Sequence, residues 1–572
     1  MSSQSPSTQF APLHLASPVT SPAPTEFGSN RPEKIGAWIL GSLCLLLLMG
    51  WAPHYLTWPW WIDLDTYAWL AQAWTAGVLP YRDVRVFNFP GQMYLFLGLG
   101  EVFGWGKTAG IYALDCTLLI SLILLILSWS RVRLGSTLPG WFASLALLTY
   151  YLNQPFNLVA QRDWHAALLA AGSLLFIQRG NGRTIALLVS ATLMGLAFII
   201  RPHVVLFFPA IGLALWLERP GDPSGSSAPA SVWKRLLLWG FGSALIVLIG
   251  FLPLILSGLI DDLVNAIRTV SYGTRYAGIA RPGLIQSLLL QTGLNRLLGG
   301  WGSLAEASRS LDLLKLGLLL AVNGIWLGRA RNRNLQKLAG PWILSLGLAF
   351  LYEPVHPIRH AYLAHPLRVF WSLNLAILVT ALSSISFPRP ATRAQSAIPW
   401  LLVCLAALLP GWPRFWSPAR SVEAWSDLVR NELPAKVPLG AQPFFKPADS
   451  RSPYRWEEYR QAIRYLRTST SETTLVANLL RNFPFPAING PVGRVSPLTA
   501  EGAIPYLYTI NADVEPEFAR VLESAPADTV VVWDPDQPTF TPFLELPTIR
   551  QVMTRHYRQE RRFGVIEIWR KR

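Results

Sequence analysis

The segment TAGIYALDCTLLISLILLILSWS (residues 108–130) carries a single acidic side chain, Asp115, and no basic one. A bilayer core is spanned by about 20 residues of apolar helix, so this segment is long enough to cross a membrane. The chain has ten further apolar runs, of which the shorter ones need flanking residues to span: 35–52, 138–152, 164–178, 184–200, 203–218, 233–257, 310–328, 339–352, 367–387 and 396–412. Together they predict a polytopic α-helical membrane protein with about 11 transmembrane helices.

The composition excludes an ordinary soluble enzyme. Of the 572 residues, 51% are hydrophobic and only 14% are charged, where a soluble domain has about 25% charged residues. The mean hydropathy is +0.32. The three cysteines, Cys44, Cys116 and Cys404, each lie inside an apolar run, so neither a disulfide framework nor a cysteine-based metal site is available.

The net charge of +16 is a signal of membrane topology and not of nucleic acid binding. With the N-terminus in the cytoplasm, the segments predicted to be cytoplasmic hold 15 bases and four acids, which is most of the excess. Loops on the cytoplasmic side of membrane proteins are enriched in lysine and arginine. The bases therefore support an odd number of spans and an extracytoplasmic C-terminal region, with the lipid bilayer and no nucleic acid as a partner.

Three parts of the chain follow from this pattern. Residues 1–34 are rich in serine, proline and threonine without a cleavage site, and predict a disordered cytoplasmic tail. Residues 35–412 form the transmembrane domain. Residues 413–572 are more charged and predict a small soluble α/β domain, with a helix at 455–467 and strands at 473–480, 528–535 and 563–569.

The first extracytoplasmic loop, residues 53–107, is too long and too polar to be a mere connection. It predicts an amphipathic helix at 66–76, closed by Gly77, and a second short apolar helix at 92–103. We expect both to lie in the membrane interface, because interfacial helices are anchored by aromatic side chains. The expected anchors are Trp58, Trp60, Trp61, Trp69 and Trp74.

Asp63 and Asp65 stand just ahead of the first loop helix and are the candidate catalytic carboxylates. One of them can instead cap the helix, and Asp65, directly before Thr66, is the better placed for that structural role. If Asp65 caps the helix, no structural role is left for Asp63. From spacing alone, the functional and the structural reading of Asp63 are evenly balanced.

Two further outer segments carry polar residues at the same membrane face. The loop NQPFNLVAQRDWH (153–165) ends with Arg162, Asp163 and His165, where Asp163 is either a helix cap or part of a site. The segment YEPVHPIRHAYLAHP (352–366) and the FIIRPH turn around Arg201 supply arginine and histidine, with Glu353 as the one acid of these two stretches. Such a cluster suits an anionic phosphate better than a structural ion pair, although Arg201 can also simply snorkel. The prolines at 354, 357 and 366 argue against a helical metal-binding pair.

Other polar positions are given lesser roles. Asp115, inside the run 108–130, is expected to be a structural acid that faces a partner. The outer stretch 258–309 is expected to be a covering loop that touches substrate. The region 413–572 contains no glycine-rich phosphate loop, no HExxH and no nucleophile elbow.

A resemblance to a known family rests on these residues together. Asp63 followed by Tyr67, Gly77, PYRD (80–83) and FNFPG (87–91) resembles the first extracytoplasmic loop of the GT-C superfamily of membrane glycosyltransferases, in particular bacterial protein O-mannosyltransferases and the aminoarabinose transferase of lipid A. Leu64 stands where the family often has glutamate, and FNFPG where a lysine commonly precedes paired prolines. GLAFIIRPHVVLFFPA (195–210) and RHAYLAHP (359–366) are similar to two further family segments. The resemblance covers residues 35–412.

The resemblance implies transfer of a sugar from a polyprenyl-phosphate donor to a lipid, polysaccharide or protein acceptor, at the outer face of a bacterial inner membrane. Asp63 would be the base of a single inverting displacement, Arg201 and Arg359 would bind phosphate, and Asp163 would orient the acceptor or a divalent ion. No cofactor is certain, and a divalent metal stays open. The rival readings are a transporter or lipid flippase and a non-catalytic relative. The candidate substrate-binding residues are Tyr67, Arg162, Asp163, His165, Arg201, His203, Arg359, His360 and Tyr362.

Overall fold

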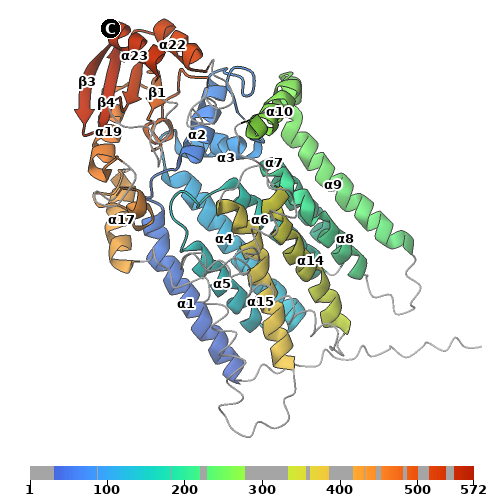
Figure 1. The fold of residues 1–572 in the computed structure, drawn as a ribbon. Helices are drawn as coiled ribbons and strands as arrows, with labels where there is room; N and C mark the ends of the chain where they lie inside the picture. Colours follow the sequence, from blue (N-terminus) through green and yellow to red (C-terminus); the bar gives the residue numbers. More distant parts are fainter. Residues whose placement is uncertain are drawn as a thin grey trace, which may run out of the picture.

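A bundle of long helices forms most of the molecule, and a small sheet stands at one end of it (Figure 1). The structure is a computed structural model. It describes residues 31–572 apart from 87, 181, 219–228, 277–332, 356–360, 385–416, 431, 446–452, 481–485, 500–513 and 536–545. The helices that match predicted apolar runs are α1 (Arg31–Tyr55), α4 (Ala109–Trp129), α5 (Leu138–Tyr151), α6 (Arg162–Gly180), α7 (Thr184–Ile200), α8 (Phe208–Leu217), α9 (Pro229–Leu256), α14 (Arg333–Val355) and α15 (His365–Ser384).

Four helices within the described ranges are long and apolar enough to cross a membrane by themselves. They cover Glu33–Tyr55, Ala109–Leu134, Val232–Leu256 and Tyr362–Ala381. The remaining matched helices are shorter or less apolar. The predicted runs 310–328 and 396–412 lie outside the described residues, so the total of about 11 spans stays a prediction.

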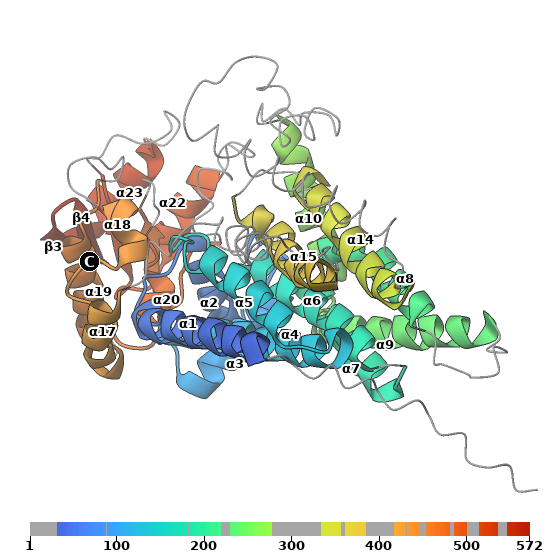
Figure 2. The same ribbon diagram turned by 90° about the horizontal axis from the view of Figure 1, so that it is seen from below.

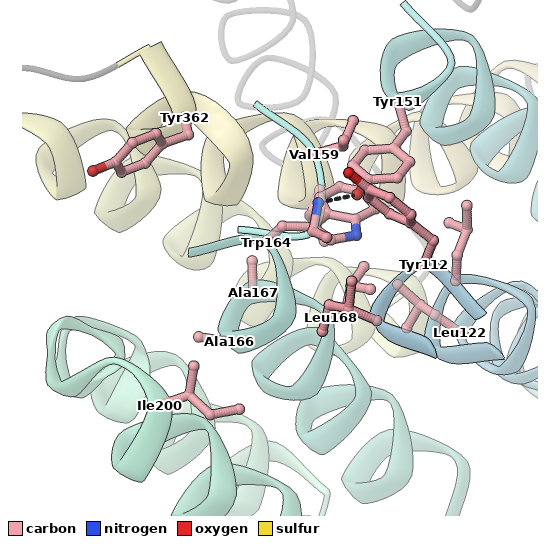
Figure 3. Close-up of a cluster of buried hydrophobic side chains, with 14 of the residues drawn as sticks. Tyr112, Leu122, Tyr151, Val159, Trp164, Ala166, Ala167, Leu168, Ile200 and Tyr362 are labelled. Atoms are coloured by element: carbon pink, nitrogen blue, oxygen red, sulfur yellow. Dashed lines mark hydrogen bonds between the residues drawn. The ribbon is translucent and has the colours of Figure 1, made fainter. Parts of the chain in front are cut away.

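Helix α6 lies at the centre of the bundle and packs against α4, α7 and α15. It is buried on nearly all sides because its sequence alternates small and large residues: Ala166 and Ala167 let neighbouring helices approach, while Trp164 and Leu168 fill the space between them. Figure 3 shows Trp164 beside Tyr151 of α5, and the two rings stack at 3.9 Å between centroids. This packing fixes the outer end of α6.

Basic residues join the ends of α6 and α8 and the start of α9 to the end of α4. There, Arg133 forms an ion pair of 2.6 Å with Glu218, and Arg235 donates to the carbonyl oxygen of Glu218. Arg179 donates to Ser128 at the same end. The charged residues among them come from three loops that the charge pattern predicts to be on one side of the membrane, and the fold brings these loops together.

The first outer loop contains α2 (Ile62–Thr75) and α3 (Gly91–Phe103). The second helix was predicted correctly, but α2 begins at Ile62 and not at Thr66. Its N-cap is Trp61, which makes no side-chain capping bond, so the prediction that Asp65 caps this helix is wrong. Gly77 follows the helix at φ +91°, a conformation that glycine adopts without strain.

The C-terminal region contains a four-stranded sheet in the order β1-β2-β4-β3. Strands β1 (Val476–Leu479) and β2 (Val530–Trp533) are parallel, and β4 (Ile566–Lys571) pairs antiparallel with β2 and with β3 (Tyr557–Phe563). The predicted helix at 455–467 corresponds to α19 (Trp456–Ser469), and the three predicted strands to β1, β2 and β4. Strand β3 was missed because its sequence, YRQERRF, is largely solvent-exposed and lacks apolar alternation. The remaining helices are α17 (Pro418–Arg430), α18 (Gln442–Phe445), α20 (Asn489–Val492), α22 (Val514–Ser524) and α23 (Pro547–His556).

The C-terminal region packs directly on the first outer loop (Figures 1 and 2). Trp58, Trp60 and Trp69 are almost completely buried. The ring of Trp58 lies against Gly440, and the ring of Trp60 lies against Gly490. The prediction that these three tryptophans anchor the loop in the membrane interface is therefore wrong, because their rings are buried inside the protein. Trp58 and Trp60 pack between the loop and the C-terminal region.

Candidate active site

The outer end of α6 carries a buried carboxylate with cationic partners. Asp163 is fully buried, and its Oδ1 accepts hydrogen bonds from Arg201 Nε and from Tyr352 OH, each at 2.8 Å. Arg162 Nε lies 3.8 Å from the other carboxylate oxygen. Arg201, for which the sequence favoured a phosphate over a structural ion pair, thus forms an ion pair with Asp163, and Asp163 is held by the turn after α7 and by α14 as well as by its own helix.

Arg162 connects this carboxylate to the first outer loop. Its Nη1 donates to Tyr67 OH of α2 at 2.8 Å. Burial raises the pKa of Tyr67 to about 12; the charge of Arg162 opposes that rise, Asp63 adds to it, and Arg201 opposes it. The two carboxylates, the two arginines and the phenol therefore share one electrostatic environment.

Local backbone geometry explains how these residues meet. Asp63 and Tyr67 are four residues apart on α2 and so share one face of the helix; the Asp63 side chain is half-buried. Arg201 has an extended backbone (φ −150°, ψ 101°) between α7 and the short 3-10 helix Pro202–Phe207. Pro202 favours this extended conformation at the residue before it. The break in the helix directs the Arg201 side chain to Asp163.

Two guanidinium groups of the cluster share one buried carboxylate, and the second carboxylate, that of Asp63, is half-buried. The side chains of Arg162 and Arg201 are both nearly buried, whereas Asp163 is the carboxylate that they share. Within the described part of the chain, Nη2 of Arg201 is buried and donates to no acceptor. An unpaired buried donor is unfavourable, so the arrangement favours binding of an anion, and guanidinium groups match phosphate oxygens well.

His203 and Tyr362, both predicted substrate contacts, lie at this cluster. The His203 ring is 5.8 Å from that of Tyr352 between centroids. Tyr362 is buried, and the charges of Asp63 and Arg162 act on it. The predicted contacts Arg359 and His360 lie outside the described residues.

Tyr352 is a member of the cluster that the sequence did not single out. It was assigned to the apolar run 339–352, where a tyrosine is an ordinary interfacial residue. Its position at the end of that run, where the polar outer segment 352–366 begins, was the available signal.

His165 does not join the cluster, contrary to prediction. Its Nε2 lies 3.1 Å from Asp115 Oδ1, and its Nδ1 lies 3.5 Å from Gln92 Oε1. Tyr55 and Tyr151 also donate to Asp115, at 2.7 and 2.5 Å. Because His165 is two residues after Asp163, it points to the opposite side of α6. It belongs to a fully buried network around Asp115, the structural acid that the sequence indicated.

Asp65 also has a different environment from Asp63. Its fully buried carboxylate accepts hydrogen bonds from the backbone N–H groups of Ile488 (2.9 Å), Asn489 (3.3 Å) and Gly490. Burial raises the pKa of Asp65 to about 6, and the three N–H groups oppose that rise. The carboxylate is therefore ionised at neutral pH, but its oxygens are occupied by the protein backbone, which leaves Asp63 as the candidate base.

The residues of the cluster do not fit a divalent metal ion. Metal ligands of this kind are carboxylate or imidazole groups whose lone pairs are accessible, whereas Asp163 is engaged by the Arg201 guanidinium and the Tyr352 hydroxyl, each at 2.8 Å. Across the described ranges, no group of three His, Cys, Asp or Glu side chains is arranged to hold a metal.

Comparison with known proteins adds one finding, at the level of the fold. The structure superposes on the crystal structure of ArnT from Cupriavidus metallidurans bound to undecaprenyl phosphate, with a TM-score of 0.53 over 93% of this chain and 97% of that chain, at 12% sequence identity. The chain has the ArnT fold. The apo state of ArnT gives a TM-score of 0.52 at 13% identity, covering 94% of this chain and 98% of that chain. No protein-family model matches the sequence, and no curated protein sequence does either. The predicted resemblance to GT-C glycosyltransferases is thus confirmed for the fold.

Proposed function

We propose that the protein is a membrane glycosyltransferase that moves a sugar from a polyprenyl-phosphate donor to an acceptor at the outer face of the membrane. The observation that carries this proposal is the buried pair Arg162 and Arg201 around Asp163, with the half-buried Asp63 on the facing helix. The ArnT fold supports it, since one of the ArnT structures is bound to undecaprenyl phosphate.

The reaction that suits these residues is a single displacement. Asp63 removes the proton from the acceptor hydroxyl or amine, and the acceptor atom attacks the anomeric carbon of the sugar while the bond from that carbon to the phosphate oxygen breaks. The configuration at the anomeric carbon is inverted. The electron pair of the broken bond stays on the phosphate, where Arg162 and Arg201 balance the added negative charge. Tyr67 and Asp163 hold the two guanidinium groups in place.

The proposed location is a bacterial inner membrane, with the N-terminus in the cytoplasm and the C-terminal region outside. The gathering of Arg133, Arg179 and Arg235 at the end of the bundle opposite α2 supports this orientation. A polyprenyl tail would then lie among the apolar helices while its phosphate reaches the arginines at their outer ends.

Replacement of Asp63 by asparagine tests the proposal. Membranes containing the wild type or Asp63→Asn are supplied with a panel of undecaprenyl-phosphate-linked sugars, and release of undecaprenyl phosphate is measured. Loss of a general base is expected to lower the rate about 10²–10⁴-fold. Glu101→Gln is the matched control, because Glu101 is a carboxylate of the same loop that is solvent-exposed.

Undiminished turnover by Asp63→Asn would overturn the assignment of the base. A wild type that binds undecaprenyl phosphate but transfers none of the sugars would favour the non-catalytic reading. Movement of the intact lipid donor across the membrane without release of phosphate would favour a flippase.

A further inference from the structure

The first outer loop is held by a short stretch of the C-terminal region. Residues Ile488–Gly493, named here the clamp segment, are all buried and include the single-turn helix α20. Three consecutive backbone N–H groups of the clamp segment, those of Ile488, Asn489 and Gly490, donate to the carboxylate of Asp65 on α2. A carboxylate that accepts several backbone N–H groups is bound strongly and directionally.

Further hydrogen bonds join the same two parts. Gln72 Nε2 of α2 donates to the carbonyl oxygen of Gly493 at 3.2 Å. From α19, Arg467 donates to the carbonyl oxygens of Pro491 (2.9 Å) and Gly106 (3.0 Å). Arg467 thus joins the clamp segment to the far end of the outer loop.

The packing leaves no room for displacement of the clamp segment. A Cβ at Gly490 would lie 2.3 Å from the Trp60 ring, and one at Gly493 would lie 3.0 Å from the backbone nitrogen of Gly106. Gly493 also has φ +71°, which favours glycine. The backbone of Gly490 therefore packs against the Trp60 ring, and the backbone of Gly493 packs against that of Gly106, too closely for any side chain to lie between them.

The clamp segment and the proposed site lie on different faces of α2. Asp65 and Gln72 are seven residues apart and share one face, whereas Asp63 and Tyr67 share another that is directed to Arg162. Because α2 is held by the clamp segment through Asp65, the residues on its other face are kept at a fixed distance from Arg162. We propose that the clamp segment positions Asp63 for catalysis, with Asp65 as the positioning residue through which it acts.

This inference rests on the proposed function for the role of Asp63, but the contact between Asp65 and the clamp segment does not. If the inference holds, weakening the contact loosens α2 and lowers kcat, since displacement of a catalytic group by about 1 Å lowers a rate about 10²-fold. The KM for the lipid donor should change little, because Arg162 and Arg201 belong to α6 and to the turn after α7.

Two substitutions weaken the contact at different points. Asp65→Asn keeps the shape of the side chain but brings an amide N–H₂ group against backbone donors. Arg467→Ala removes the bonds to Pro491 and Gly106 and leaves α2 itself unchanged. Arg464→Ala is the matched control: Arg464 lies on the same helix, and its ion pair with Glu432 is exposed.

The first measurement is amide hydrogen exchange, which needs no substrate. In the wild type, the N–H groups of residues 488–490 should exchange slowly. In Asp65→Asn and in Arg467→Ala, exchange should rise both in the clamp segment and in α2, and stay unchanged in α6. Unchanged exchange in α2 in both variants would overturn the inference.

The second measurement is steady-state transfer with the sugar donor that the wild type uses. We expect kcat to fall about 10²-fold in Asp65→Asn and about tenfold in Arg467→Ala, with KM for the donor within about twofold of the wild type and Arg464→Ala unaffected. Full activity of both variants, when Asp63→Asn is inactive, would overturn the inference and leave the proposed function intact. Raised exchange in α2 together with a wild type that transfers no sugar would overturn the proposed function and leave the clamp intact.

Discussion

Replacing Arg201 separates its structural role from its proposed role in catalysis. Its Nε donates to Asp163 at 2.8 Å, and its Nη2 has no acceptor within the described part of the chain. Arg201→Met removes the charge at similar side-chain length. Asp163 then keeps the hydroxyl of Tyr352 and the more distant guanidinium of Arg162.

The size of each effect follows from these distances. Removing one member of a buried ion pair costs about 3–5 kcal/mol, and we expect the lower end because Arg162 is only 3.8 Å from the remaining carboxylate. Losing one cation that stabilises the leaving phosphate should lower kcat about 10²–10³-fold, in line with loss of a transition-state donor. The double variant Asp163→Asn with Arg201→Met removes both charges, so it should recover most of the stability but none of the activity.

Thermal unfolding in detergent and the rate of undecaprenyl phosphate release check both parts. The single variant should melt below the wild type and the double variant close to it, while both remain slow. Arg201→Lys, which keeps the charge but lacks the planar fork of donors, should fall between the wild type and Arg201→Met in rate. Recovery of activity in the double variant would refute the reasoning, because Arg201 would then serve only to balance Asp163.

Three further outcomes follow from other contacts. Asp115→Asn should lower the free energy of unfolding by about 1–3 kcal/mol, because three donors converge on that carboxylate. Turnover per folded molecule should stay unchanged, and unfolding and activity assays on the variant and the wild type measure both effects. Gly490→Ala should lower the free energy of unfolding by about 1–3 kcal/mol, because the added methyl group overpacks against Trp60. Gly98→Ala has open space around its Cβ and should raise the free energy of unfolding by about 0.5–1 kcal/mol through helix propensity. Burial raises the pKa of Asp65 to about 6 from 3.8, so the folded protein binds this proton more tightly than the unfolded chain does. The part of the stability that is linked to this proton is fully present below about pH 4 and is lost as the pH rises through 6. The wild type should therefore gain about 1.4 kcal/mol over Asp65→Asn between about pH 7 and pH 5 in unfolding experiments.

The parts of the fold that depend on local pattern were predictable from sequence. The apolar runs that form α1, α4, α7 and α9 are long enough to be recognised in the sequence. Helix α3 ends at Phe103, directly before Gly104. Arg162, Asp163 and Arg201 were recognised as candidate substrate contacts because polar residues between apolar runs must lie near the membrane surface. In each case the information is contained within a few neighbouring residues.

The errors arise where a partner comes from a distant part of the chain. Asp65 reads as a helix cap in its own segment, but its partners are the backbone groups of Ile488, Asn489 and Gly490. Trp58 and Trp60 belong to a tryptophan-rich segment of the kind that anchors a loop at the membrane interface, but residues from the C-terminal region cover them. His165 follows Arg162 and Asp163 in the sequence, but its side chain lies on the opposite side of α6, beside Asp115. Side-chain direction and long-range cover are properties of the tertiary fold, and single segments do not encode them.

The charges of the cluster are matched to the change of charge in the proposed reaction. A phosphodiester donor carries one negative charge and the departing phosphate carries two, while Asp63 loses its own negative charge by taking the proton. The field at the arginines therefore becomes more favourable for the phosphate as its charge grows. Asp63→Asn imitates the state after transfer, so it should bind undecaprenyl phosphate about 10²-fold more tightly than the wild type does, the effect of removing one charge about 10 Å from a phosphate with two charges at an effective dielectric constant of about 20. Native mass spectrometry with undecaprenyl phosphate measures this, and weaker binding by the variant would mean that Asp63 does not face the phosphate at all.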